Sequence, residues 1–243
     1  MDYYYITGTS RGLGRALTDE LLQDPHTTVI GVARGEGLTQ ERYRHVALDL
    51  ADLSSVRAFR FEDHPDARRI VLVNNAASLV LKRMGAADPQ TIVDNFNIDV
   101  VSPTILMNAF IASYGATAAE LVICNLTSNA ANTAIDSAAL YGGPKAALEL
   151  VTRTIEYEAN FTGKTGLHAF CIDPGSMDTG MQAYLRSFEA TEWERSELVR
   201  QRYEDGLIVP PATVAGPIAR VLREPSLAPS SVFAWNEILE TNQ

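Results

Sequence analysis

Two kinds of apolar pattern alternate along the chain. Short runs of apolar and β-branched residues, bounded by turn residues, predict strands over residues 3–6, 28–32, 45–48, 70–73, 121–126, 167–172 and 231–234. Longer segments, in which apolar positions recur every three or four residues, predict helices over 13–22, 53–61, 89–113, 145–161 and 212–222. Such alternation is typical of a parallel sheet with crossover helices. We therefore expect the α/β class, with about seven strands in one doubly wound parallel sheet and helices on both faces.

No linker, internal repeat or low-complexity tract divides the 243 residues, so we predict a single domain over 1–243. The segment 182–206 differs from its surroundings because it is charged, contains Trp193 and lies between a strand and the last predicted helix. Long insertions of this kind are often lids over a site. We therefore interpret 182–206 as a substrate lid.

The charge balance narrows the classes of partner. Twenty Lys and Arg against thirty Asp and Glu leave a formal net charge of −10, which on average repels nucleic-acid phosphates and anionic lipids. No stretch has the form of a membrane span or a signal peptide, and the two cysteines, Cys124 and Cys171, are far apart in apolar runs. The four histidines share no metal-ligand spacing. We expect a cytoplasmic protein without metal, nucleic-acid partner or membrane association.

A glycine-rich turn follows the first predicted strand and precedes the first predicted helix. It reads Thr7-Gly8-Thr9-Ser10-Arg11-Gly12-Leu13-Gly14. Glycine permits unusual dihedral angles and a close approach of the backbone to a pyrophosphate, and the helix N-terminus offers free N–H groups to it. Taken alone, the pattern is also compatible with an ordinary tight turn. Its place between strand and helix favours dinucleotide binding.

Five stretches in register resemble the short-chain dehydrogenase/reductase family. They are the glycine-rich turn, Asn74-Asn75-Ala76-Ala77, Asn97, Ser128 with Tyr141-Gly142-Gly143-Pro144-Lys145, and Pro174-Gly175-Ser176-Met177-Asp178-Thr179. Alanine stands at position 77, where the family usually has glycine. The resemblance covers nearly the whole chain and implies a Rossmann-type fold with a nicotinamide cofactor. The cofactor contacts it implies are Gly8, Ser10, Arg11, Gly12, Leu13, Gly14, Asn75, Ala76, Tyr141, Lys145, Pro174, Gly175, Met177 and Thr179.

Reduction of a carbonyl by hydride needs an acid for the developing alkoxide, and a tyrosine with its ordinary pKa of about 10 is a weak one. Tyr141 and Lys145 are four residues apart, so on a helix they share a face, where the ammonium would lower the tyrosine pKa. Ser128 would hold the substrate oxygen and, by resemblance, Asn97 would anchor a water that passes protons to Lys145. Without the other motifs, a packed tyrosine and a solvated lysine would explain the pattern. Pro144 lacks an N–H, so we expect Tyr141 at or just before the helix start.

The second predicted strand suggests which nicotinamide cofactor is used. Enzymes that prefer NAD usually place a carboxylate at its end, whereas this strand runs into Ala33 and Arg34. Arg34 and Arg11 could both pair with a 2′-phosphate, although either could be an ordinary surface residue. We expect NADP (NADPH) rather than NAD. By resemblance, Asp49 and Leu50 contact the adenine, and Met177 and Thr179 contact the nicotinamide carboxamide.

Within the family, the stretches 75–79, 139–141, 178–182 and 198–206 resemble the sepiapterin reductase and benzil reductase branch. The sepiapterin enzymes carry an aspartate near the C-terminus that grips the pterin, and Val232-Phe233 stands at that position here. We therefore expect a largely apolar substrate pocket beyond the carboxyl ends of the strands. Its expected lining is Leu79, Met181, Tyr184, Leu185, Trp193 and, at the last strand, Phe233, with Ser128 and Tyr141 at the reacting carbonyl.

We predict an NADP-dependent carbonyl reductase that transfers hydride from NADPH to a ketone or a 1,2-diketone such as benzil, with Tyr141 as the acid. The alternatives are a sepiapterin reductase, an alcohol dehydrogenase running in the oxidative direction and a non-catalytic NADP sensor. The intact Ser128, Tyr141 and Lys145 argue against the sensor, which needs no acid. In the resembled family the long helices pack against symmetry mates, so we also expect a homodimer. The surplus apolar positions on these helices include Ile105, Leu106, Phe110, Leu148, Leu150 and Val151.

Overall fold

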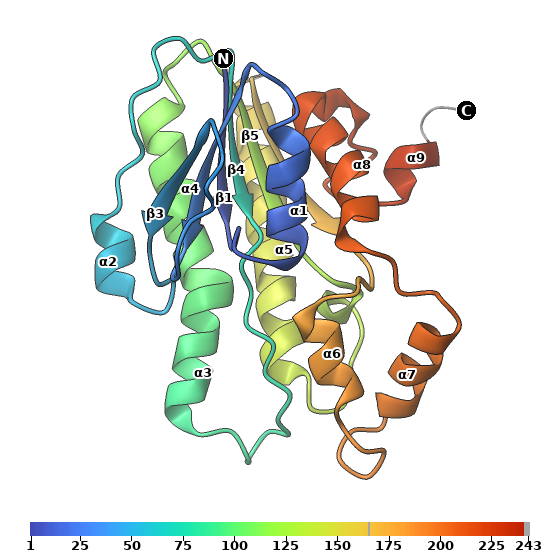
Figure 1. Cartoon of the computed structure of the whole chain (residues 1–243). Helices are drawn as coiled ribbons and strands as arrows, with labels where there is room; N and C mark the ends of the chain where they lie inside the picture. The colour runs from blue at the N-terminus through green and yellow to red at the C-terminus, as the bar shows by residue number, and fades with distance from the viewer. Residues whose placement is uncertain (165, 241–243) are drawn as a thin grey trace.

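The computed structural model describes residues 1–164 and 166–240. Its strands are β1 (Asp2–Thr7), β2 (Thr27–Ala33), β3 (Tyr43–Ala47), β4 (Arg69–Asn74), β5 (Glu120–Leu126), β6 (Leu167–Asp173) and β7 (Val232–Ala234). They form one sheet in the order β3-β2-β1-β4-β5-β6-β7, and every pairing is parallel. The chain runs outward from β1 to β3 and then returns to β4, so the strand order reverses between β1 and β4 (Figure 1). The predicted seven-stranded, doubly wound parallel sheet is therefore confirmed.

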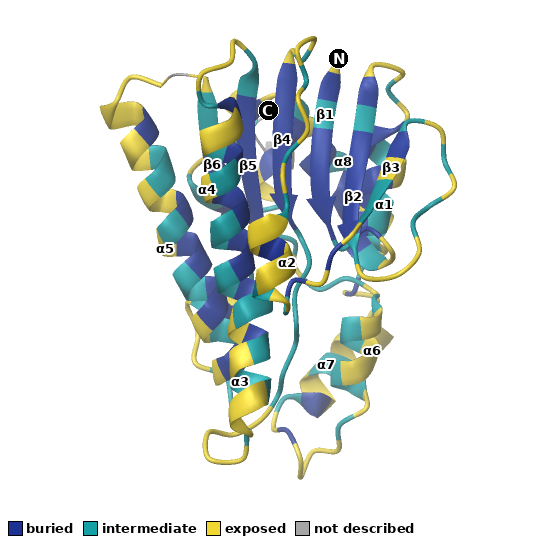
Figure 2. Ribbon diagram, turned by 90° about the vertical axis from the view of Figure 1, so that its left-hand side faces the viewer, coloured by how far each residue is buried: buried dark blue, intermediate teal, exposed yellow. Residues whose placement is uncertain are grey.

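Helices cover both faces of the sheet (Figure 2). One face carries α1 (Gly12–Leu21), α8 (Pro211–Arg223) and α9 (Glu237–Glu240), and the other carries α2 (Leu53–Ala58), α4 (Ser102–Tyr114) and α5 (Ala139–Phe161). Successive residues of β1 join alternate cores, because side chains of a strand point to opposite faces. Tyr4 and Ile6 pack with α1 and α8, whereas Tyr5 packs with α4.

The long helix predicted over 89–113 is present, with a local change of winding. It consists of α3 (Pro89–Phe96), a π-helical turn η1 (Asn97–Val101) and α4 without a break. By length and composition alone, Pro89–Tyr114 could cross a membrane, with a mean hydropathy of 1.2. Leu106, Met107 and Phe110 are instead buried against the sheet, as in the core helix of a globular protein.

Other helices differ from the predicted boundaries. The structure ends α2 at Ala58 rather than at residue 61, because Phe59 turns to an extended backbone and packs with Phe61 on the core. Two helices, α6 (Gly180–Arg186) and α7 (Ser196–Glu204), occupy the segment that we interpreted as a lid. Figure 1 shows both beyond the carboxyl edge of the sheet. Short 3₁₀ turns, η2 (Asn129–Ala131) and η3 (Pro225–Leu227), complete the described part of the chain.

Candidate active site

The glycine-rich turn between β1 and α1 places its glycines at positions that disfavour a side chain. Gly8 and Gly12 have positive φ angles of 77° and 58°, in the left-handed region that favours glycine. A Cβ on Gly14 would lie 2.3 Å from the carbonyl oxygen of Gly8, so the helix and the turn are in direct backbone contact. No side chain caps the first turn of α1. Its N–H groups and the positive end of the helix dipole are therefore available to an anion.

Asn75 braces this turn from the end of β4. Its side-chain amide donates to the carbonyl oxygens of Thr7, at 2.8 Å, and Gly8, at 3.2 Å. The backbone N–H groups of Asn75 and Ala76 both donate to the Thr7 hydroxyl at 3.0 Å. Both amide hydrogens of Asn75 are thus engaged by the turn, so its role is to fix the turn's shape at the point where the strand order reverses.

The arginines expected near a 2′-phosphate follow neighbouring strands at the same edge. Arg34 comes directly after β2, Arg11 lies in the turn after β1, and the Gly8 N–H donates to the Val32 carbonyl at 2.8 Å. Both arginines are exposed, and neither has an ion pair or a side-chain hydrogen bond within the described residues. Asp49 is also exposed, whereas Leu50 is buried. Two cations without partners are therefore available to an anionic group.

Ser128, Tyr141 and Lys145 come together beyond β5. Ser128 lies two residues after β5, and its Oγ accepts the Ala130 N–H at 3.3 Å. Tyr141 lies in the first turn of α5, and the Nζ of Lys145 is 5.9 Å from the centroid of its ring. Lys145 is 3% exposed and donates to the carbonyl oxygen of Leu126 at 2.7 Å. The structure thus brings the expected acid, its cation and the hydroxyl into one site.

Burial is the largest influence on the pKa values of Tyr141 and Lys145. Desolvation raises the pKa of Tyr141 to about 12, a hydrogen bond with Ser128 opposes the rise, and the charges of Asp99 and Asp173 add to it. Desolvation also lowers the pKa of Lys145, and Asp99 is the largest opposing influence. The pKa of Tyr141 is therefore raised, not lowered as expected, because the cost of burying a phenolate is the largest influence on it. Tyr141 rests in the protonated form that an acid requires.

The first turn of α5 differs from the expectation built on Pro144. The helix begins at Ala139, so Pro144 is its sixth residue rather than part of its first turn. Gly142 allows a close approach here, since a Cβ at this position would lie 2.4 Å from the Ala130 carbonyl oxygen. The early start brings Tyr141 and Lys145 onto one regular helix.

Asn97, which we expect to anchor a water that passes protons to Lys145, is the first residue of η1. Its side-chain amide donates to the Ala51 carbonyl oxygen at 3.4 Å, after β3. The group on η1 that influences Lys145 and Tyr141 is Asp99, which is 1% exposed. Sequence analysis missed Asp99, because Asp94 and several other polar residues of the same helix gave no reason to single it out.

The loop after β6 contacts the glycine-rich turn. The methyl carbon of Thr179 would lie 3.5 Å from a Cβ on Gly12. Gly175 has a φ of 65°, and its N–H donates to the Asp173 carboxylate at 2.9 Å. Met177 is partly buried against the core and Pro174 directly follows β6. This loop therefore borders the space in which the expected cofactor contacts meet.

The expected substrate wall is only partly where the sequence suggested. Met181, Tyr184 and Leu185 lie on α6 and are at least partly exposed, as is Leu79 after β4. Trp193 is 5% exposed, packs on Phe188, and donates its indole N–H to the Asp136 carbonyl oxygen at 3.1 Å. We interpret it as an anchor of the segment between α6 and α7.

Phe233 was wrongly placed in the wall. It is 3% exposed and packs on Phe170, with ring centroids 5.7 Å apart, in the core under α8. Successive side chains of β7 point to opposite faces of the sheet, and Phe233 points to the face that packs in the core.

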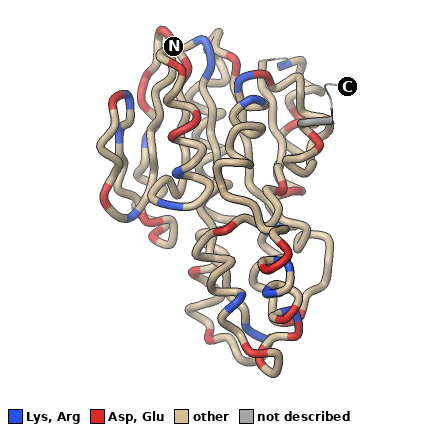
Figure 3. Tube along the Cα trace, turned by 45° about the vertical axis from the view of Figure 1, so that its right-hand side comes forward, with Lys and Arg blue, Asp and Glu red and all other residues tan. Residues whose placement is uncertain are grey.

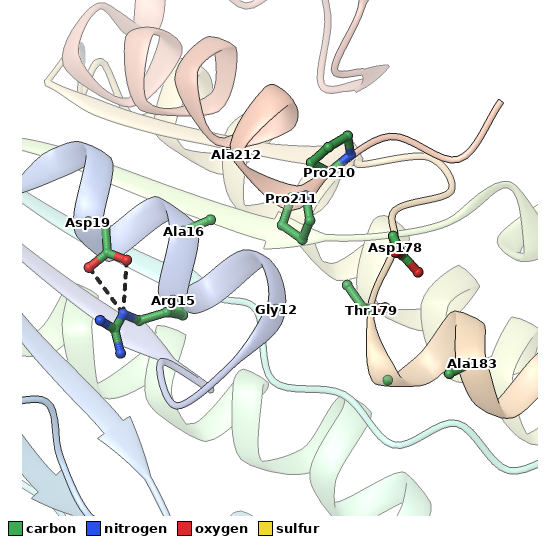
Figure 4. A pocket seen from close by; sticks show the side chains of 11 residues that line it. Gly12, Arg15, Ala16, Asp19, Asp178, Thr179, Ala183, Pro210, Pro211 and Ala212 are labelled. Atoms are coloured by element: carbon green, nitrogen blue, oxygen red, sulfur yellow. Dashed lines mark hydrogen bonds and ion pairs between the residues drawn. The ribbon is translucent and has the colours of Figure 1, made fainter. Parts of the chain in front are cut away.

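A hollow of about 570 Å³ opens between α1, α6 and the start of α8 (Figure 4). Gly12 and Thr179, two of the expected cofactor contacts, line it together with Pro211. Arg15 and Asp19 close one side through an ion pair of 2.9 Å. The hollow is therefore continuous with the glycine-rich turn rather than a separate site.

Comparison with known proteins agrees with this arrangement. Residues 3–190 match the family model described as short chain dehydrogenase. A benzil reductase ((S)-benzoin forming) of Bacillus subtilis is 28% identical over 237 residues, covering 92% of this chain and 94% of that protein. A sepiapterin reductase of Xenopus laevis is 27% identical over 226 residues, covering 84% of each.

Solved structures show the same fold. A short chain dehydrogenase/reductase of Saccharomyces cerevisiae superposes with a TM-score of 0.85 at 23% identity, covering 97% of this chain and 96% of that one. A gluconate 5-dehydrogenase described as NAD(P)-dependent, from Beutenbergia cavernae, was solved with bound NADP. It superposes with a TM-score of 0.79 at 21% identity, covering 99% of this chain and 97% of that one.

Proposed function

Because the chain belongs to the short-chain dehydrogenase/reductase family of oxidoreductases, we propose that it is a carbonyl reductase that uses NADPH to reduce a ketone or a 1,2-diketone. The observation that carries the proposal is the group of Ser128, Tyr141 and Lys145 beside a glycine-rich turn. When bound, the cofactor supplies the hydride, and the chain supplies the proton and the orientation of the carbonyl.

The residues present fit such a cofactor. A Cβ at Gly8 would meet Asn75 and Ala76, and a Cβ at Gly14 would meet the Gly8 carbonyl oxygen, so only glycine fits these positions. Because no side chain caps α1, its first N–H groups are available to a pyrophosphate. Arg11 and Arg34 would hold a 2′-phosphate. The net charge of −10 makes these local cations important, and Figure 3 shows Lys and Arg dispersed among Asp and Glu. These features favour NADP over NAD.

In the proposed reaction, the Ser128 hydroxyl donates a hydrogen bond to the substrate oxygen and Tyr141 transfers its proton to that oxygen as the alkoxide develops. The buried Lys145 ammonium stabilises the phenolate that Tyr141 leaves behind. The Leu126 carbonyl oxygen accepts a hydrogen bond from one of the three hydrogens of this ammonium. Tyr141 and Lys145 lie on the same face of α5. Lys145 thus acts as an electrostatic support and not as the proton donor to substrate.

We propose an apolar aromatic substrate for this pocket. Leu79, Met181, Tyr184 and Leu185 offer a wall that buries a phenyl ring favourably, at about 25 cal/mol per Å² of apolar surface. The similarity to benzil reductases and to sepiapterin reductases supports a carbonyl substrate of either kind. We favour benzil because none of these four wall residues provides a carboxylate for a pterin. We further propose that 182–206 acts as the lid, and that the protein works as a cytoplasmic homodimer.

The test combines a substrate panel with one substitution. Purified protein and NADPH should reduce benzil with a higher kcat/KM than sepiapterin or simple aldehydes, followed as loss of NADPH absorbance. Tyr141→Phe should lower turnover about 10²-fold or more while NADPH affinity changes only a few-fold, because the ring is retained and the proton is lost. Efficient sepiapterin reduction would favour the pterin alternative, and undiminished turnover of Tyr141→Phe would remove Tyr141 as the acid.

A further inference from the structure

Glu149 is a buried carboxylate that the proposed chemistry does not use. It lies one helical turn after Lys145 on α5 and is 4% exposed. One of its oxygens accepts a hydrogen bond from the Thr127 hydroxyl at 2.7 Å, and the other accepts one from the side-chain amide of Asn132 at 3.4 Å. The second oxygen also lies 3.6 Å from the guanidinium of Arg153, at the surface of the helix. A buried carboxylate is costly unless it is hydrogen-bonded, and here both oxygens have donors.

The two hydrogen-bond donors stand on either side of Ser128 in the chain. Thr127 directly precedes it and is 2% exposed, and Asn132 directly follows the turn η2. Within this segment, the Ser128 carbonyl oxygen accepts the Ala131 N–H at 2.9 Å. Glu149 therefore holds both ends of the segment on α5, which is the helix that carries the proposed acid.

One side of α5 carries three polar side chains at intervals of four residues. Tyr141, Lys145 and Glu149 follow one another along it, because four residues make about one helical turn. Lys145 donates to the Leu126 carbonyl oxygen at 2.7 Å, and Glu149 accepts from the adjacent Thr127. Consecutive turns of the helix thus bind consecutive residues of the chain. The next residue along the chain is the serine of the site.

We propose that Glu149 is a positioning residue of the active site, which fixes the direction of the Ser128 hydroxyl relative to Tyr141 by holding the chain on both sides of Ser128. It acts through this segment and does not contact the reacting atoms. The consequence for turnover rests on the proposed function, whereas the connection between α5 and the segment does not. A misdirected Ser128 hydroxyl should lower kcat, because the substrate oxygen is then poorly oriented toward the acid.

Substitutions at both ends of the hydrogen bond test this role. Glu149→Ala removes the shared acceptor and should lower kcat for a ketone or diketone substrate about tenfold, with NADPH affinity changed less than about twofold. Glu149→Gln keeps an oxygen acceptor for the Thr127 hydroxyl and should restore most of the activity. Thr127→Val removes the donor and should lower kcat as Glu149→Ala does. The control is Glu158→Ala, which removes an exposed glutamate of the same helix and should leave kcat unchanged.

A double-mutant cycle with Ser128 separates positioning from a general loss of structure. In a protein that already carries Ser128→Ala, Glu149→Ala should lower kcat by less than about a further twofold, because the hydroxyl that it positions is gone. A merely structural role lowers kcat by the same factor with and without Ser128, and that result overturns the proposal. Should Glu149→Ala fail to fold, Thr127→Val takes its place in the cycle.

Amide hydrogen exchange tests the connection itself, without reference to activity. The N–H groups of Ala131 and Asn132 are hydrogen-bonded within the segment, at 2.9 and 3.1 Å. They should exchange about tenfold faster in Glu149→Ala than in the unmodified protein, because the segment opens more often. The N–H groups of β1, two strands away from β5, serve as the internal control and should be unchanged. Unchanged exchange at Ala131 and Asn132 overturns the proposal, while faster exchange in a protein that reduces no carbonyl refutes the proposed function instead.

Discussion

At the scale of a single residue, the proposed preference for NADP depends on Arg34. It is exposed, lacks a partner within the described residues, and follows β2 beside the glycine-rich turn. Arg34→Asp should shift the preference from NADP toward NAD by about 1–3 kcal/mol, because it removes a charge-assisted hydrogen bond and adds a repulsive charge. The measurement is the ratio of kcat/KM for the two cofactors. Arg60→Asp, the same change at an exposed residue after α2, serves as the control, and an unchanged ratio in Arg34→Asp would contradict the assignment.

Other single residues mark the limit of reading this site from sequence. The spacing of Tyr141 and Lys145 carries its own geometry, since four residues make about one helical turn. Asn97 and Asp99 are two residues apart on a helix, so they point roughly to opposite sides, and their polarity cannot say which side faces Lys145. Trp193 is a residue type that often lines an apolar pocket. Here its indole N–H donates a hydrogen bond to the Asp136 carbonyl oxygen, so it anchors the segment between α6 and α7 instead.

Gly14 tests whether the strand, turn and helix form one packed element. A Cβ at this position would meet the Gly8 carbonyl oxygen at 2.3 Å and the Asn75 side-chain nitrogen at 2.5 Å. Gly14→Ala should therefore force the turn apart and lower the free energy of unfolding by about 1–3 kcal/mol. It should also weaken NADPH binding on the order of tenfold, because the N–H groups of α1 lose their fixed direction.

Gly166→Ala provides the control for that substitution. Among the described residues other than its chain neighbours, no atom lies within 4 Å of a Cβ at Gly166, which precedes β6 at the amino end of the strands. The change should alter the free energy of unfolding by less than about 0.5 kcal/mol and leave NADPH affinity intact. Urea unfolding and fluorescence titration with NADPH measure the two quantities. Equal effects at both glycines would show that the turn tolerates a side chain.

At this scale the sequence predicts the interior elements better than the peripheral ones. All seven strands are found because each must bury apolar side chains in the sheet, which produces continuous apolar runs. Helices α6 and α7 expose much of their surface, so they carry little apolar periodicity to detect. The predicted start of α5 at residue 145 was wrong for a different reason. Two glycines and Pro144 are typical of a helix boundary, but α5 begins at Ala139 and continues through them.

The whole molecule leaves an apolar strip of α5 exposed. Three of the six surplus apolar positions named from sequence, Leu106, Phe110 and Leu148, are buried in the core and contribute no free surface. The exposed apolar side chains of α5 are Leu150, Tyr157 and Phe161, which are 67%, 70% and 81% exposed. Their spacing of seven and four residues places them along one side of the helix. A strip of this kind is typical of a surface that another molecule covers.

An isologous dimer through α5 would cover this strip with its own copy, as the resemblance to the family leads us to expect. Light scattering at micromolar concentration should then give about twice the mass of the 26.5 kDa chain. Leu150→Glu combined with Phe161→Glu should yield the monomer, because each substitution is present twice and would place charges in an apolar interface. Leu198→Glu, at a residue of α7 that is 54% exposed, changes a comparable surface away from α5 and should leave the mass unchanged. A monomeric unmodified protein would contradict the proposed dimer.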